Sequence, residues 1–340
     1  MAFSGAYTFA DWATREHFAP KVQDVVFNSN AVTAILRKNL KTLSGGRRIE
    51  SFAQYKKKSG HGFVGKSDTL VASFEQQHDA AFWAWKFQTE PVGLYIADIL
   101  MNSGEDARFD LVMNENIAAA KKLADDFGSA MFATDYLVGG GAAIDSLDHS
   151  VSNSAAVDTE VNFSATYAGV ARATTGDGAT WNANVDDTTT TFNVSAANDL
   201  WLDCTEGSDM PTMWCSNNKA YSFFYDEMTP IQRQDAEVLT GKMGFTSAVL
   251  NGAPWVVDSH CPSLDRVVPA SPWGSTPTSE YVYALNTNYI QIEAHEDAVF
   301  SYWGNKEPVD QFSVIGRYWF MGNVTNYNPR FSGKMSALTA

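Results

Sequence analysis

The sequence predicts an α+β protein, and three observations carry that prediction. A long amphipathic helix is expected over about residues 110–133, a glycine-tipped β-hairpin over about 47–90, and a set of short strands in the second half of the chain. Of the 340 residues, 45% are hydrophobic, so the chain is long and apolar enough to bury a core in roughly two domains.

The first part of the chain, residues 1–46, is predicted to be an N-terminal arm. One short amphipathic stretch, 30–43, places apolar residues at helical spacing, and Gly45 and Gly46 end it. The first 20 residues lack a charged segment followed by an apolar one, so no secretory signal is expected.

Residues 47–90 are predicted to form an extended β-hairpin loop. Its first limb is expected over 48–55, and its return limb, where bulky and small residues alternate, over 69–76. The tip between the limbs is basic and rich in glycine, with Lys56, Lys57, Lys58, Gly60, Gly62 and Gly65. Because an isolated two-stranded hairpin is barely stable in water, this one is expected to pack on something else, such as a neighbouring subunit.

The strongest helix signal lies over about residues 110–133. Apolar residues recur there at alternating spacings of four and three, at Met113, Ile117, Ala120, Ala124, Phe127 and Met131. At about 1.5 Å per residue the helix would be roughly 35 Å long, which suits a rod that braces a flat molecule. The apolar seam is expected to face the core and to bind no cofactor.

The remaining elements are predicted from local composition. The aromatic segment 81–103 is expected to form strands, and residues 137–205 a surface loop, a strand near 188–194 and a helix capped by Ser195. Further elements are expected as strands near 211–215, 255–258, 281–285 and 314–324, and as a helix opening at Thr229–Pro230.

The charges are distributed unevenly along the chain. Residues 1–66 carry 11 Lys and Arg against four acidic residues, whereas the remaining 274 carry 13 basic and 35 acidic residues. The formal net charge of −15 argues against a protein that coats DNA, which needs cations to neutralise phosphates. Because residues 1–66 are basic and the remaining residues are acidic, we expect the arm of one copy to lie on the body of another. The alternative is that the basic segment is simply solvated.

One segment has the pattern of a nucleotide-binding loop. Gly60–Ser67 satisfies G-x-x-x-x-G-K-[ST], in which the backbone cradles phosphates and the lysine, here Lys66, reaches them. The motif requires a buried strand before it and a helix after it. Three lysines precede it, which cannot end a buried strand, and the residues that follow alternate like a strand. Nucleotide binding through Gly60–Ser67 is therefore kept only as a minor alternative.

No other pattern predicts catalysis or a bound group, so the protein is expected not to be an enzyme and to need no metal or cofactor. Cys204, Cys215 and Cys261 are odd in number and lack zinc-ligand spacing, which fits a reducing compartment. The six histidines show no metal-ligand spacing, and no nucleophile elbow is present. No segment approaches the roughly 18 consecutive apolar residues of a membrane span, so no membrane contact is expected.

Several segments follow one another in a recognisable order. They are Ala80–Lys86, Asn114–Asp135, Tyr167–Arg172 with Trp181, Gln232–Arg233, Gly244–Phe245, Leu250–Pro254, Asp258, Tyr283–Asn286 and Asn323–Arg330. In this order they resemble the major capsid proteins of tailed double-stranded-DNA bacteriophages, which have the Hong Kong 97-type fold, and the resemblance covers about residues 30–340. Asn114–Asp135 looks like the spine helix of that family, and Ala80–Lys86 like the end of its extended loop.

The resemblance implies a division of the chain and a structural role. The implied parts are the arm at 1–46, the extended loop at 47–90, a peripheral domain from 80–136 and 296–340, and an axial α/β domain at 137–295. Copies of the chain would form pentamers and hexamers of an icosahedral shell around double-stranded DNA. The implied partners are a scaffolding protein, a portal and a decoration protein, and the implied location is the virion, assembled in the host cytoplasm.

Contacts between copies are expected from the extended loop and the arm. The basic residues predicted to make them are Arg47, Arg48, Lys56, Lys57, Lys58 and Lys66. An encapsulin-like compartment shell of the same fold remains an alternative, because the sequence does not separate a shell around DNA from one around cargo enzymes.

Overall fold

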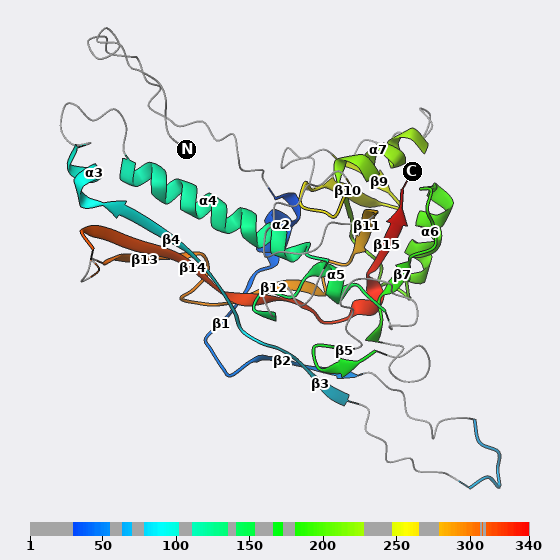
Figure 1. The fold of residues 1–340 in the computed structure, drawn as a ribbon. Helices are drawn as coiled ribbons and strands as arrows, with labels where there is room; N and C mark the ends of the chain where they lie inside the picture. Colours follow the sequence, from blue (N-terminus) through cyan, green and yellow to red (C-terminus); the bar gives the residue numbers. More distant parts are fainter. Residues whose placement is uncertain are drawn as a thin grey trace.

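The computed structural model describes residues 30–54, 63–69, 78–101, 111–134, 141–153, 166–172, 181–227, 247–264, 279–306, 308 and 311–339. The molecule is elongated, with one sheet and a long helix at one end, a second sheet with shorter helices at the other, and a β-hairpin projecting away from both (Figure 1). This is the α+β organisation that the sequence predicts.

The first sheet lies against the long helix α4 (Leu111–Met131), which confirms the strongest prediction from the sequence. Its strand order is β1-β12-β14-β13, with β4 paired along much of β14. The strands are β1 (Lys41–Leu43), β4 (Lys86–Tyr95), β12 (Ile290–His295), β13 (Ser301–Lys306) and β14 (Ser313–Asn326). Phe127 of α4 packs edge-on against Phe320 of β14, with the ring centroids 5.0 Å apart. The helix thus covers one face of the sheet.

The second sheet has the strand order β7-β15-β11-β8-β10-β9. Its strands are β7 (Asn184–Asp186), β8 (Met213–Ser216), β9 (Ser247–Leu250), β10 (Ala253–Val257), β11 (Glu280–Leu285) and β15 (Gly333–Leu338), and the helices beside it are α6 (Val194–Asp203) and α7 (Asn218–Glu227). Trp214 stacks between Trp201 and Trp255, with ring centroids 5.5 and 5.4 Å away. Because indole rings bury more apolar area than other side chains, this stack dominates the second core.

The projecting hairpin consists of β2 (Ile49–Gln54) and β3 (His78–Trp83), which pair antiparallel. Residues 63–69 lie at its far end, well away from the body (Figure 1). A small ladder, β5 (Thr166–Tyr167) and β6 (Val170–Ala171), packs against the hairpin base, where Phe82 N donates to Ala168 O at 2.9 Å. Gly169, between these strands, has a φ of +79°, and a Cβ there would overlap the Phe82 ring, so the turn requires glycine.

Short helices complete the described chain. They are α2 (Ala31–Leu36), the 3₁₀ turn η1 (Arg37–Asn39), α3 (Ile96–Met101), α5 (Leu147–Ser150) and the 3₁₀ turn η6 (Pro329–Phe331). The side chain of Asn30 caps α2 by accepting from Thr33 N at 3.0 Å. The helix predicted over 30–43 is shorter than expected, because Leu40 is extended and β1 pairs in parallel with β12.

Three other predictions differ from the structure. Strand β2 pairs with His78–Trp83 rather than with 69–76; residues 70–76 of that predicted limb lie outside the described part. The segment 81–103 does not continue as strand, because Ile96–Met101 is helical. Helix α6 is capped by Asn193 and not by Ser195, since the Asn193 side chain accepts from Ala196 N at 2.6 Å. Asn and Ser are both good N-caps, so residue type alone does not identify the capping residue.

The domain boundaries remain a prediction. Two strands, β15 and β12, pair with strands on the other side of a predicted boundary. Strand β15 was placed in the peripheral part by the sequence and pairs with β7 and β11 in the second sheet. Strand β12 was placed in the axial part and pairs with β1 and β14 in the first sheet. The helix predicted to open at Thr229–Pro230 lies outside the described residues.

Candidate functional site

The hairpin is fastened to the body by one buried tyrosine, Tyr167. Its hydroxyl oxygen accepts from the Trp83 indole at 3.2 Å and from Asn326 N at 3.0 Å. Its backbone carbonyl accepts from the Trp181 indole at 3.1 Å. Tyr167 therefore joins β3 of the hairpin, the end of β14 and the segment before β7 at one point.

The titratable groups near Tyr167 include Asp145, His149 and Arg172. Burial, reinforced by Asp145, raises the pKa of Tyr167, so the phenol keeps its proton. Burial and the nearby Arg172 lower the pKa of His149 to about 3, so that imidazole is uncharged at neutral pH. The guanidinium of Arg172 lies 5.4 Å from the centroid of the Tyr167 ring and donates to His149 O. The hairpin base is thus a specific polar contact inside an apolar cluster.

The basic residues predicted to contact neighbouring copies are only partly described. Arg47, Arg48 and Lys66 are exposed, whereas Lys56, Lys57 and Lys58 lie outside the described residues. Arg48 forms an ion pair with Glu50, and its guanidinium lies 4.4 Å from the Phe82 ring centroid, so it also acts within the subunit. The structure does not bring Arg48 and Lys66 together. Arg48 directly precedes β2 at the base of the hairpin, whereas the segment 63–69, which contains Lys66, lies at the far end of the projection (Figure 1).

The described part of the P-loop pattern, residues 63–67, does not have the structure that such a loop needs. Lys66 and Ser67 form an exposed turn, and Asp68 and Thr69 after them are not helical. A phosphate-binding loop opens a helix whose first N–H groups point at the phosphates. Residues 60–62 of the pattern lie outside the described part.

A surface that the sequence did not reveal lies on the first sheet, on the face turned away from α4. Side chains alternate along β4: Gln88 and Glu90 reach α4, where they contact Leu123 O and Lys122, and Val92 is buried. The residues between them face outward, and Phe87 and Tyr95 are each 64% exposed.

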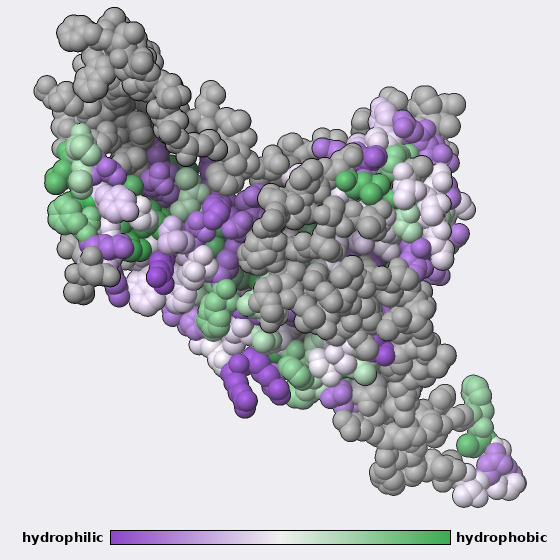
Figure 2. All heavy atoms as spheres, viewed as in Figure 1, coloured by the Kyte–Doolittle hydropathy of each residue, from purple (hydrophilic) through white to green (hydrophobic). Residues whose placement is uncertain are grey.

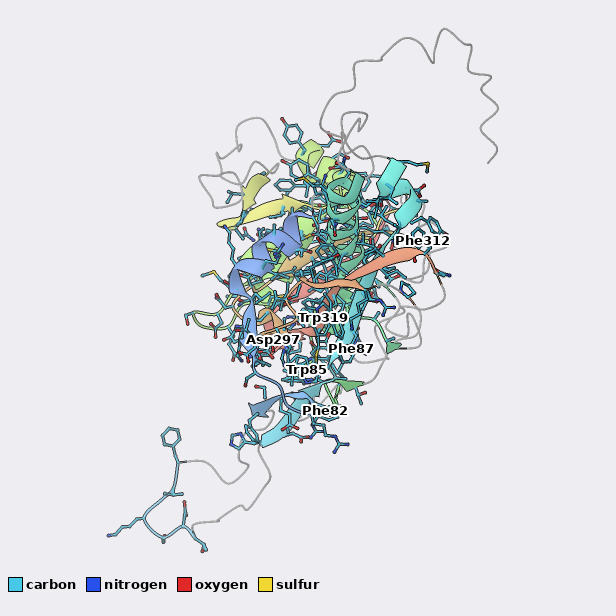
Figure 3. The ribbon with its side chains drawn as sticks, turned by 90° about the vertical axis from the view of Figure 1, so that its left-hand side faces the viewer. Phe82, Trp85, Phe87, Asp297, Phe312 and Trp319 are labelled. Atoms are coloured by element: carbon cyan, nitrogen blue, oxygen red, sulfur yellow. The ribbon has the colours of Figure 1, made fainter. Side chains whose placement is uncertain are left out.

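The neighbouring strands extend this outward face. Trp319 of β14 lies opposite Thr89 of β4, and its ring centroid is 5.7 Å from that of Trp303, which is 59% exposed. Figure 3 views this end of the molecule and shows Phe87 and Trp319 beside one another, with Phe312 towards the outer end of β14. Arg317 and Lys306 add positive charge to the aromatic residues, and Lys306 Nζ lies 5.0 Å from the Trp303 ring centroid.

The outer end of the first sheet is apolar as well. Figure 2 shows hydrophobic side chains gathered where α3 and β13 lie in Figure 1. The exposed apolar residues of this end are Tyr95, Leu100, Met101, Met113, Ile117 and Phe312. We give the name open aromatic face to Phe87, Tyr95, Trp303 and Trp319, which lie on the side of the sheet turned away from α4. Exposed apolar surface of this kind marks a binding or assembly surface in proteins.

The exposure of two residues of α4 corrects one prediction about that helix. Met113 and Ile117 were expected in the core but are 59% and 42% exposed. The buried residues of the helix are Ala119, Leu123, Phe127, Ala130 and Met131. Two overlapping apolar stripes run along α4, and only the tertiary contacts decide which of them faces the sheet.

A buried charged cluster joins the two halves of the molecule. The His260 ring lies between two carboxylates, with Nδ1 3.1 Å from Asp258 Oδ1 and Nε2 2.8 Å from Asp125 Oδ1. The other oxygen of Asp258 accepts from Val32 N at 2.9 Å. Burial alone would lower the pKa of His260, but the hydrogen bonds and charges of Asp258 and Asp125 outweigh it and raise that pKa. The cluster links α2, α4 and the turn after β10.

Comparisons with solved structures identify the fold. The chain superposes on a subunit of the cyanophage A-1(L) capsid with a TM-score of 0.65, 13% identity and coverage of 96% of this chain and 98% of that one. It superposes on the capsid of a native GTA particle with a TM-score of 0.65, 11% identity and coverage of 99% and 100%. For the SrpI encapsulin of Synechococcus elongatus the TM-score is 0.59, with 7% identity and coverage of 97% and 94%.

The chain therefore has the fold of tailed-phage major capsid proteins, as its resemblance to the Hong Kong 97-type family predicted. No protein-family model matches the sequence, and no curated protein is significantly similar to it. Within the described ranges, no group of three or more His, Cys, Asp or Glu residues is arranged to hold a metal ion. No helix in the described part of the chain is long and apolar enough to cross a membrane.

Removing the hydroxyl of Tyr167 is expected to weaken the hairpin attachment. Tyr167→Phe leaves the Trp83 indole and Asn326 N without their acceptor, which should lower the free energy of unfolding by about 2–4 kcal/mol. Urea unfolding followed by tryptophan fluorescence measures this. Tyr225→Phe, at an exposed tyrosine, is the control and should change stability by less than about 0.5 kcal/mol. Equal stability of the two variants would contradict the role given to Tyr167.

The His260 cluster is expected to make stability depend on pH. Because its pKa is raised in the folded state, its contribution is complete below the unfolded pKa of about 6.5 and is lost as pH rises through the folded pKa. His260→Gln should therefore destabilise by roughly 1–2 kcal/mol near pH 6 and by less near pH 8.5. Thermal unfolding across this range tests it, with His78→Gln on the exposed β3 as control. A pH-independent difference from the wild type would refute the assignment.

Proposed function

We propose that this chain is the major capsid protein of a tailed phage, a structural subunit that assembles into pentamers and hexamers of an icosahedral shell around double-stranded DNA. The observation that carries the proposal is the fold, which matches phage capsid subunits over nearly the whole of both chains. The proposed location is the virion. A scaffolding protein, a portal and a decoration protein are proposed as partners, and DNA is enclosed without sequence-specific binding.

The open aromatic face supports assembly from copies of the chain. In the described part of the chain, a helix covers one side of the first sheet, whereas the other side presents exposed Phe87 and Trp303 and partly exposed Trp319 without a second apolar layer. Burying aromatic side chains between subunits stabilises an assembly by removing this area from water. A shell in which every copy contacts several others covers such a face in each of them.

The hairpin supports the same conclusion. Its base is fixed by Tyr167, but Phe52, near the middle of β2, is exposed, as are Phe63 and Val64 at the far end. A two-stranded ribbon with exposed aromatic residues gains stability by lying on another surface. The basic residues Arg47 and Lys66, with Lys56, Lys57 and Lys58, favour the acidic body of a neighbouring copy as that surface.

A second candidate function is a compartment shell that encloses cargo enzymes. The SrpI encapsulin has the same fold, so the fold favours neither shell over the other. Neighbouring terminase and portal genes would favour the phage capsid, and a neighbouring cargo enzyme would favour the compartment. Nucleotide binding is not favoured, because Lys66 and Ser67 form an exposed turn and the two residues described after them, Asp68 and Thr69, are not helical.

Negative-stain electron microscopy of the expressed protein, alone and with its neighbouring genes, tests the proposal. Closed hollow shells are the expected result. Nucleic acid extracted from shells made with the neighbouring genes would support the capsid, whereas a co-purified enzyme would support the compartment. Small particles in both preparations would contradict a shell function, and magnesium-ATP binding with a Lys66→Ala control would then be measured.

Placing a charge on the open aromatic face is expected to prevent assembly without unfolding the subunit. Phe87→Glu changes a side chain that is 64% exposed, so the stability of the separate subunit should change by less than about 0.5 kcal/mol. Burying an unpaired carboxylate between copies is costly, so shells should be absent. Phe87→Tyr keeps the aromatic surface and should assemble. Normal shells from Phe87→Glu would show that this face is not an interface.

Reversing the charge of the hairpin tip is expected to slow assembly. In Lys56→Glu/Lys57→Glu/Lys58→Glu, attraction to the acidic body becomes repulsion, so the rate of shell formation should fall at low salt and approach the wild-type rate at high salt. Light scattering follows the rate. The matched triple Lys→Arg variant keeps the charge and should resemble the wild type. An unchanged rate in the Glu variant at low salt would exclude the arm-on-body interaction.

A further inference from the structure

Two of the three cysteines lie close together in the core between the two halves of the molecule. Cys215 is on β8, Cys261 is in the turn after β10, and both are fully buried in the same apolar cluster. Cys204, at the end of α6, is equally buried but has the Asn184 amide beside it at 3.3 Å. The chain thus has one thiol pair and one matched single thiol.

The strand register supports this placement independently. Cys215 lies directly opposite Tyr283 on β11, so their side chains share one face of the second sheet. The thiol of Cys261 donates to the carbonyl of Tyr281, two residues earlier on β11, at 3.6 Å. Cys215, Cys261, Tyr281 and Tyr283 all belong to the same buried cluster. The two thiols therefore lie on one face of the second sheet, over adjacent strands.

The backbone on both sides of the pair is held in place. Asp258 N donates to Ser216 O at 2.9 Å, and the Asn217 amide donates to Pro262 O at 3.0 Å. These contacts fasten the turn that carries Cys261 alongside the end of β8, one and two residues after Cys215. A cross-link between the sulfurs would connect segments that are already adjacent, which limits the strain of forming it.

We propose that Cys215 and Cys261 are a latent intramolecular disulfide, reduced while the protein is made and oxidised once it reaches an oxidising environment. The oxidant is a low-molecular-weight disulfide such as oxidised glutathione. One cysteine thiolate attacks it and releases one reduced glutathione, and the second thiolate then displaces the other. The two thiols lose two protons and two electrons, and one S–S bond forms in the protein as one in glutathione breaks.

Burial keeps the pair reduced during synthesis and assembly. It raises the pKa of Cys215, so little thiolate is present, and exchange requires a brief local opening of the core. Once formed, the disulfide would fix the turn that carries Asp258 and His260 to β8. That turn also holds α2 through Val32 and α4 through Asp125, so one covalent bond would secure the junction of the two sheets.

The test uses the full chain as dispersed subunits, so its outcome does not depend on shell formation. The protein is incubated with oxidised glutathione in low urea, which permits local opening, and free thiols are counted after denaturation. The expected result is a fall from three thiols to one, a mass about 2 Da lower, and a proteolytic fragment joining Cys215 to Cys261. Three remaining thiols, or stable glutathione adducts without that fragment, would overturn the proposal.

Matched variants separate the pair from the single cysteine. Cys204→Ser should lose both remaining thiols on oxidation, whereas Cys215→Ser should form no intramolecular cross-link. Oxidation should raise the midpoint of thermal unfolding of the wild type and of Cys204→Ser, because the bond closes a loop of roughly 45 residues in the unfolded chain. A midpoint that rises equally in Cys215→Ser would show that the gain has another cause. Failure of these tests would leave the shell function unaffected.

Discussion

In the described part of the chain, the first sheet has a helix on only one of its faces, and much of the remaining structure depends on that constraint. The pleat of β4 sends Gln88, Glu90 and Val92 towards α4 and leaves Phe87 and Tyr95 outside. Towards the other end of β14 the outward face is covered, since the Asn323 amide donates to Ala84 O at 3.1 Å and to Asp145 Oδ2 at 3.1 Å. Among the described residues, the uncovered part thus lies towards the outer end of the molecule. An apolar face of this kind is suited to contact with another surface.

Apolar contacts and directional polar contacts play different roles in this structure. Apolar contacts fill each core, and the Trp201–Trp214–Trp255 stack is the clearest case. Directional polar contacts set how the parts are placed: Tyr167 fixes the hairpin base, and Asp258 with His260 fixes α2 and α4 beside the second sheet. A buried hydrogen bond costs most when one partner is removed, so these contacts specify geometry more than they add net stability.

Local periodicity made much of the fold predictable. Helix α4 and strands β8, β10, β11 and β14 follow from patterns within single segments, and the order of weak family resemblances correctly indicated the capsid fold. The sequence could not show which stripe of α4 is buried, because Met113 and Ile117 are as apolar as Leu123 and differ only in what faces them. The sequence could not reveal the open aromatic face for a related reason. It predicts Phe87 and Trp319 to be strand residues, but the pattern of a strand does not distinguish a covered sheet face from an uncovered one.

Contacts between segments that are distant in the sequence could not be predicted from it. Val32 and Asp258 are separated by 226 residues, and Asp125 and His260 by 135, so no spacing rule relates them. The same holds for Cys215 and Cys261. From the sequence, the odd number of cysteines indicates only a reducing compartment. These contacts converge on the turn after β10, where the N-terminal helix, the long helix and the second sheet meet. The fixed contacts thus lie at a junction inside the molecule, away from the exposed outer face and the projecting hairpin. The polar cluster and the thiol pair occupy that position.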